Sequence, residues 1–236
     1  MVAKLGIVTL IGLLIIGIAG CVEEKNSTTS KPELTSEYKV ECSPITEFGT
    51  AYLKVKVEGK AKDLKVMLSD PEGSTIDFTL ISKDDLIDGI EAVKVAMSRC
   101  GETPKPGTYT LIIKQYFPEK VLYKEELTFS GAKVSVLDVE FETTFFEYAN
   151  TYNISSLKLL ITNNGDLPAI IDKIVIVIDD KESEIPFFFE DIPPKENKVI
   201  IEKPFLSFLD SGTYPVTIKL YSGQIELTSY ETQIEL

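Results

Sequence analysis

The 236-residue sequence contains no histidine and no tryptophan, and Arg99 is its only arginine. Without histidine, the chain lacks the usual general base near neutral pH and the commonest protein ligand of metal ions. Aromatic platforms for sugars commonly use tryptophan, so tyrosine would have to take that place here. The formal net charge of −13 repels nucleic acid. We therefore expect no catalytic residues, no metal, no cofactor and no nucleic-acid partner.

Cysteine is also scarce, and the first of three cysteines ends the one long apolar run. This run extends from Leu5 to Gly20 without a charge, follows the basic Lys4, and finishes as Ile18-Ala19-Gly20-Cys21. Its sixteen residues are fewer than the roughly 20 that cross a bilayer core. The pattern favours a cleaved signal peptide over residues 1–20. An uncleaved signal anchor is the alternative.

The N-terminal segment resembles the lipobox of bacterial and archaeal lipoproteins, in which the peptide is cut before the cysteine and lipid is attached to the thiol. The resemblance implies an anchor at Cys21 in the cell membrane, with the protein facing outside the cytoplasm. Residues 22–36 are polar, so 21–36 are predicted to be the lipidated cysteine and a flexible tether. Such a tether has a root-mean-square span of about 20 Å, which keeps the folded part near the membrane.

The two remaining cysteines, Cys42 and Cys100, form an even pair in a chain predicted to lie outside the cytoplasm. A disulfide between them is the natural prediction. It would close a loop of roughly 58 residues and stabilise the fold by about 4 kcal/mol. Two separate buried thiols are the alternative, while two cysteines without histidine supply too few soft ligands for zinc.

From Tyr38 onward, alternating or short apolar runs are bounded by turn residues, which is typical of β-strands. Residues 52–57 alternate cleanly, and 64–68 lead to the turn Asp70-Pro71-Glu72-Gly73. Residues 83–98 are ambiguous, because Ser82 to Asp85 has the form of a helix capping box. We expect one helical turn at 83–88 and a strand at 92–98, with a helix to about residue 98 as the alternative.

An internal repeat indicates two domains of similar design. Residues 107–116, Gly-Thr-Tyr-Thr-Leu-Ile-Ile-Lys-Gln-Tyr, recur at 212–221 as Gly-Thr-Tyr-Pro-Val-Thr-Ile-Lys-Leu-Tyr, with six identical positions. The spacing of 105 residues matches one β-sandwich. The motif resembles the immunoglobulin-like strand whose tyrosine hydroxyl bonds back to the preceding corner, so Tyr109 and Tyr214 are predicted to be structural. The predicted fold is all-β, with two tandem immunoglobulin-like antiparallel β-sandwiches at 37–131 and 132–236.

The second predicted domain resembles a known family. Its matching segments are Ile161-Thr162-Asn163-Asn164-Gly165, Pro193-Pro194-Lys195-Glu196 and Gly212-Thr213-Tyr214-Pro215-Val216. Together they are similar to the CARDB group of immunoglobulin-like domains, which occur on bacterial and archaeal surface proteins. The last strand lacks the asparagine with which that family usually closes. Abundant lysine and glutamate with few glutamines fits a thermophile, although AT-rich codon usage gives the same bias.

Phe187, Phe188 and Phe189 form the one candidate interaction patch. Three successive aromatic residues in a strand cannot all face one core, so at least one points outward or into a second interface. Burial between two sheets under a long loop is the alternative. For chemistry the sequence offers little, since it has no calcium-binding Asp-x-Asp-x-Asp-Gly loop and no glycine-rich phosphate loop.

These observations predict a membrane-anchored surface lipoprotein that is a non-catalytic interaction or structural module. Its partner would be a protein or a glycan at the cell surface. The alternative is a solute- or carbohydrate-binding lipoprotein that works with a transporter or a surface hydrolase. Solute-binding lipoproteins are usually two-lobed α/β proteins, and the scarcity of helical periods argues against that class.

Overall fold

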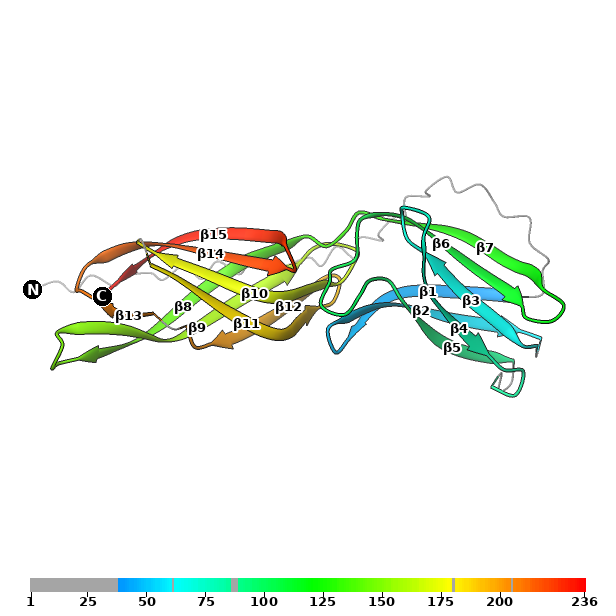
Figure 1. The fold of residues 1–236 in the computed structure, drawn as a ribbon, viewed down its shortest axis with the longest axis horizontal. Helices are drawn as coiled ribbons and strands as arrows, with labels where there is room; N and C mark the ends of the chain where they lie inside the picture. Colours follow the sequence, from blue (N-terminus) through cyan, green and yellow to red (C-terminus); the bar gives the residue numbers. More distant parts are fainter. Residues whose placement is uncertain (1–37, 61, 86–88, 180, 205) are drawn as a thin grey trace, which may run out of the picture. The chain divides into compact units, whose positions relative to one another are not determined.

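Every element in the described part of the chain is a β-strand, fifteen in all. The structure is a computed structural model that describes residues 38–236 except 61, 86–88, 180 and 205. The strands form antiparallel sheets that face one another in two β-sandwiches, as the sequence predicted (Figure 1). Among the described residues there is no helix long and apolar enough to cross a membrane.

The first sandwich contains seven strands in two sheets. The strands are β1 (Tyr38–Glu47), β2 (Thr50–Gly59), β3 (Leu64–Ser69), β4 (Thr75–Ile81), β5 (Ile90–Ala96), β6 (Gly107–Gln115) and β7 (Lys120–Phe129). One sheet has the order β1-β2-β5 and the other the order β4-β3-β6-β7. The strand predicted at 92–98 is β5, displaced by two residues. The capping box forms a turn, because Asp85 N donates to Ser82 O and Ser82 N donates to the Asp85 carboxylate. Part of the predicted helical turn, residues 86–88, lies outside the described residues.

The second sandwich contains the other eight strands. They are β8 (Val134–Phe146), β9 (Thr151–Asn163), β10 (Ala169–Ile178), β11 (Lys181–Ile192), β12 (Glu196–Glu202), β13 (Leu206–Leu209), β14 (Thr213–Ser222) and β15 (Ile225–Glu235). One sheet has the order β11-β10-β14-β15. In the other, β12 and β13 pair with successive segments of β9, and β8 pairs with the opposite edge of β9.

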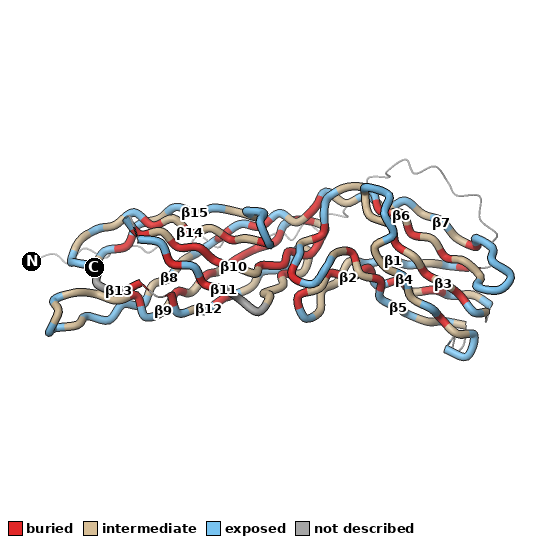
Figure 2. Tube along the Cα trace, viewed as in Figure 1, coloured by how far each residue is buried: buried red, intermediate tan, exposed pale blue. Residues whose placement is uncertain are grey.

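Period-two burial explains why these segments form strands. In β2 the side chains of Leu53, Val55 and Val57 are fully buried, while the two intervening lysines are not. Burying each aliphatic side chain stabilises the fold by about 1.5–3 kcal/mol. The β-branched strand β10 departs from this pattern, because buried residues follow one another along it (Figure 2). Each sandwich has its own cluster of buried apolar side chains.

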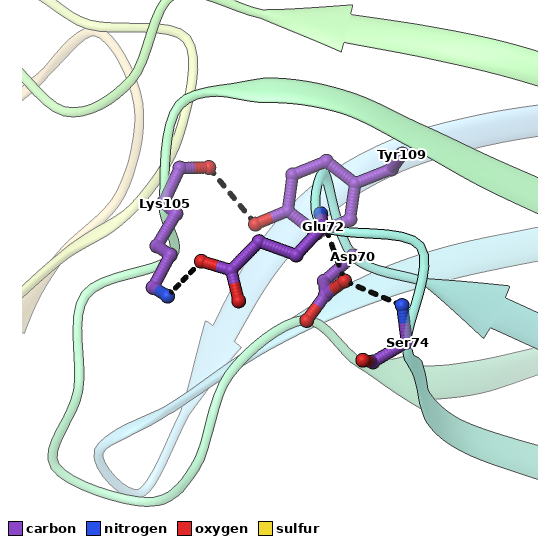
Figure 3. Close-up of polar contacts among 5 residues, drawn as sticks. All are labelled: Asp70, Glu72, Ser74, Lys105 and Tyr109. Carbon is purple, nitrogen blue, oxygen red and sulfur yellow. Dashed lines mark hydrogen bonds and ion pairs between the residues drawn. The ribbon is translucent and has the colours of Figure 1, made fainter.

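The repeated tyrosines hold equivalent corners, as the sequence predicted. The Tyr109 hydroxyl donates to Lys105 O at 2.9 Å, and the Tyr214 hydroxyl donates to Asp210 O at 3.0 Å. Figure 3 shows the first corner, where Lys105 also forms an ion pair with Glu72 beside the β3–β4 turn. Burial, and next the Asp70 charge, raise the pKa of Tyr109 to about 12, so the hydroxyl remains a hydrogen-bond donor.

The two sandwiches belong to one compact unit of the chain, Pro32–Leu236, and share side chains at their junction. Leu167 and Ile170 follow β9 in sequence but are buried in the core of the first sandwich. The Thr103 hydroxyl accepts from Ile170 N at 2.9 Å and donates to Ile170 O at 3.2 Å. The Asp166 carboxylate accepts hydrogen bonds from the backbone nitrogens of Ser130 and Gly131. The junction therefore combines apolar packing with hydrogen bonds between residues of the two sandwiches.

Candidate functional site

A surface groove lies at the junction, beside the turn that connects β1 and β2. It is lined by Glu47, Phe48, Phe189, Glu190, Asp191 and Lys198. The first two residues come from the first sandwich and the other four from β11 and β12 of the second. The groove is therefore built by both sandwiches.

Phe48 is the most unusual residue of the groove. It is 94% exposed and has φ = 48°, with Gly49 at φ = 72°. Two successive positive φ values are those of a type I′ hairpin turn, in which Asn, Asp or Gly normally takes the first position. A phenylalanine there costs about 1–2 kcal/mol of backbone strain and leaves a large apolar ring in water. Neither property stabilises the fold, which makes this ring the candidate contact residue of the groove.

Phe189 is the second aromatic residue that lines the groove, and it packs across the junction. Its φ is 44°, and its side chain lies against Gly49 and Gly101 of the first sandwich. A Cβ atom at either glycine would overlap Phe189, so both positions require glycine; we call Gly49 and Gly101 the glycine seats of Phe189. Gly101 N donates to Gly49 O at 2.8 Å, which joins the two seats. Phe189 is thus a packing residue, whereas Phe48 points its exposed ring into solvent.

The polar rim of the groove is held by one hydrogen bond across the junction and by contacts within each sandwich. Asp191 accepts from the Thr46 hydroxyl at 2.7 Å through Oδ2, and Lys198 Nζ donates to Asp191 O at 3.0 Å. Lys198 Nζ also lies 2.5 Å from the Glu190 carboxylate and 3.6 Å from the Asp191 carboxylate. Glu47 pairs with Lys94 at 2.5 Å. The rim therefore has fixed geometry before any ligand arrives.

Carboxylates outnumber amines around the groove. Glu47, Glu190 and Asp191 line the groove with one amine, Lys198, and Lys94 pairs with Glu47, which leaves an excess of one negative charge. Burial, and next repulsion by Glu190, raise the pKa of Glu202 in the neighbouring strand β12. The excess of negative charge beside an exposed aromatic ring suits a ligand with an apolar face and amine or hydroxyl groups. Within the described residues, no group of three or more His, Cys, Asp or Glu side chains could hold a metal ion.

The structure brings one residue of the predicted aromatic patch, Phe189, to this groove. The side chains of Phe187 and Phe188 lie outside the described part of the structure, as does the predicted lipidation site Cys21. Sequence reasoning missed Phe48 and the two glycine seats. The available signal was the dipeptide Phe48-Gly49 between two alternating runs, which is a hairpin turn with an unsuitable first residue.

The predicted disulfide is absent, because Cys42 and Cys100 are free thiols. Cys42 lies in β1 and packs against the first core, and burial, and next the Glu125 charge, raise its pKa to about 12. Cys100 is exposed, and its Sγ lies 3.9 Å from Phe48 O. Phe48 is six residues beyond Cys42 along the chain. At about 3.3 Å per strand residue, the two thiols are about 20 Å apart. A disulfide needs Cα atoms within about 7 Å.

Comparisons with known proteins identify no family for this chain. No family model matches this sequence, and no curated protein matches it. A two-domain fibronectin type III segment of chicken tenascin is 11% identical, with 84% of this chain and 98% of that chain covered and a TM-score of 0.32. An Amycolatopsis orientalis exo-chitosanase is 7% identical with a TM-score of 0.36. The match covers 80% of this chain but 26% of the chitosanase chain. The YadV chaperone is 11% identical, with 85% and 100% covered and a TM-score of 0.23.

Proposed function

We propose that this protein is a non-catalytic interaction module, anchored to the outer side of the cell membrane by lipid on Cys21. It would contact its partner through the groove around Phe48. The observation that carries this proposal is Phe48 itself, because it combines backbone strain with 94% exposure at a groove of fixed geometry. Strained, exposed aromatic residues are characteristic of contact sites.

The chemistry of the groove defines the partner. An aromatic ring beside a rim in which carboxylates outnumber lysines would bind a protein segment that carries an apolar side chain next to lysine or arginine. The short predicted tether would place this partner close to the membrane. The lipobox-like segment supports the anchor, and the CARDB-like motifs support a place among surface proteins.

The anchor and the groove are tested separately. The Cys21→Ser variant should release the protein from the membrane fraction without unfolding it, and the mass of the mature wild-type N-terminus should include lipid. For the groove, membranes are solubilised in detergent and the anchored protein is captured with its partner. Phe48→Ser should abolish co-capture. Tyr148→Ser is the matched control, because Tyr148 is 87% exposed in the β8–β9 turn and lies outside the groove. Equal capture by both variants would refute the groove.

A carbohydrate partner is the second candidate. Exposed aromatic rings beside carboxylates also suit sugar rings, since one face of a sugar is apolar and its hydroxyls donate hydrogen bonds. A solute- or carbohydrate-binding lipoprotein that serves a transporter or surface hydrolase would use the groove in this way. Glycan-array binding that disappears in Phe48→Ser and persists in Tyr148→Ser would favour it over a protein partner.

A further inference from the structure

A second exposed aromatic site lies at the other end of the first sandwich, in the turn between β6 and β7. We call Tyr116, Phe117 and Val121 the β6–β7 tip. Phe117 is 76% exposed, and Tyr116 and Val121 are exposed as well. The two rings meet edge to face with centroids 4.5 Å apart. Gln115 Nε2 donates to Phe117 O at 2.6 Å, which holds the turn. The tip is therefore an ordered apolar projection.

Lysines surround this tip, although the chain as a whole is acidic. Lys65 and Lys114 line the shallow pocket beside the two rings, and the exposed Lys120 and Lys124 follow along β7. One acidic residue lines the same pocket, Glu119, which pairs with Lys114 at 2.8 Å. Exposed aromatic rings ringed by lysine are typical of surfaces that enter the headgroup layer of a membrane. The pocket beside the two rings is thus lined by more lysine than acidic residues, although Asp63 also lies next to Tyr116.

The first described strand begins at this same end. Tyr38 opens β1 and its hydroxyl donates to Lys60 O at 3.3 Å, in the segment that connects β2 to β3. In that segment Asp63 O accepts from Tyr116 N at 2.9 Å, which links the start of β1 to the tip (Figure 1). Cys21 precedes Tyr38 by 17 residues. The first described strand therefore begins next to the tip, 17 residues after Cys21.

We propose that the β6–β7 tip docks on the lipid headgroup surface of the membrane that holds the chain. The proposal rests on the anchor in the proposed function and adds an orientation to it. Phe117 and Tyr116 enter the headgroup layer, while the neighbouring lysines face anionic headgroups. Phe48 lies about 33 Å away, at the far end of the ten-residue β1. Docking at the tip therefore turns the groove away from the lipid and toward a partner.

Tethering makes this weak contact sufficient to keep the tip on the membrane surface. An untethered chain with a net charge of −13 would be repelled by an anionic membrane once it came within the Debye length of about 8 Å. A short tether replaces that approach with a high effective concentration of the tip at the surface. At contact distance the nearby lysines act, each increasing partitioning onto an anionic surface about fivefold.

The absence of tryptophan and histidine allows a direct test. The chain from Val22 onward, which contains every described residue, receives an N-terminal histidine tag and is bound to vesicles that contain a nickel-chelating lipid. This tether does not depend on Cys21, so a failure of lipidation cannot affect the result. Phe117→Trp places the sole indole at the tip. Phe48→Trp is the matched control at the other end of the same sandwich. Brominated phosphatidylcholine reports contact by quenching.

We expect brominated lipid to quench the Phe117→Trp variant at least threefold more than the Phe48→Trp variant. Adding phosphatidylglycerol should increase the quenching, and raising the salt concentration should reverse that increase. Equal quenching of the two variants, or no quenching of either, would overturn the proposal and leave the tip to a protein or a second copy of the chain. Loss of the anchor in Cys21→Ser cells, with tip quenching intact, would separate the two proposals.

Discussion

Replacing Asn163 by alanine tests how the second sandwich is joined to the first. Asn163 ends β9 and is fully buried. Its Oδ1 accepts from Lys133 N and Gly165 N, both at 3.0 Å. Its Nδ2 donates to Leu167 O at 2.8 Å and to Ile192 O at 3.1 Å. One side chain therefore holds the connection between the sandwiches, the turn after β9 and the end of β11.

The magnitude follows from the groups that would be left without a partner. Each hydrogen bond contributes about 1 kcal/mol, and a buried polar group left unpaired costs about 1–3 kcal/mol. With four such groups partly rescued by water, Asn163→Ala should lower the free energy of unfolding by about 4 kcal/mol. For a domain of this size, that corresponds to a fall in Tm of roughly 15 °C or more.

Chemical denaturation followed by far-ultraviolet circular dichroism measures this effect. Asn164→Ala is the matched control, because the neighbouring Asn164 is exposed and engages through its backbone nitrogen and oxygen. Its substitution should change the free energy of unfolding by less than about 0.5 kcal/mol. A loss below 1 kcal/mol in Asn163→Ala, or equal losses in the two variants, would show that the side chain does not hold the junction.

The tyrosine corners and the thiols give two further tests. Tyr109→Phe should lower the free energy of unfolding by about 1–2 kcal/mol, and Tyr214→Phe by less, because Tyr214 is more exposed. Denaturation curves check this, and a larger loss in Tyr214→Phe would contradict it. Iodoacetamide at pH 8 should label Cys100 and spare Cys42, as mass spectrometry of the peptides would show; labelling of Cys42 first would contradict its burial. Because folding raises the Cys42 pKa from 9.0 to about 12, the stability it contributes is complete below pH 9 and is lost as the pH rises toward 12.

The strand pattern and the repeat were predictable because they depend on local chemistry. Alternation in residues 52–57 follows from one buried face, and the paired Tyr109 and Tyr214 follow from a shared corner design. The ambiguous region around Ser82 divides into a turn and β5, because the capping residues pair with each other and β5 pairs with β2. In the alternating strand, the repeated corner and the Ser82 turn, neighbours in sequence determine the structure, whereas β5 also needs the distant strand β2 as its partner.

The junction and the groove were not predictable, because they depend on contacts between distant segments. Ile170 reads as one more residue of an apolar strand, yet it packs in the other sandwich. Gly101 reads as an ordinary loop glycine until Phe189 lies against it. The disulfide prediction was wrong for the same reason, since counting cysteines ignores that Cys42 lies in the middle of β1 while Cys100 lies beside the β1–β2 turn.

Photo-crosslinking from position 48 in intact membranes tests the central claim most directly. A photoreactive amino acid replaces Phe48 in one anchored variant and Tyr148 in another. We predict a discrete crosslinked species from position 48, which disappears when Asp191→Ala removes part of the groove rim, and no such species from position 148. No crosslink from position 48, or equal crosslinking from both positions, would contradict the interaction module proposed here.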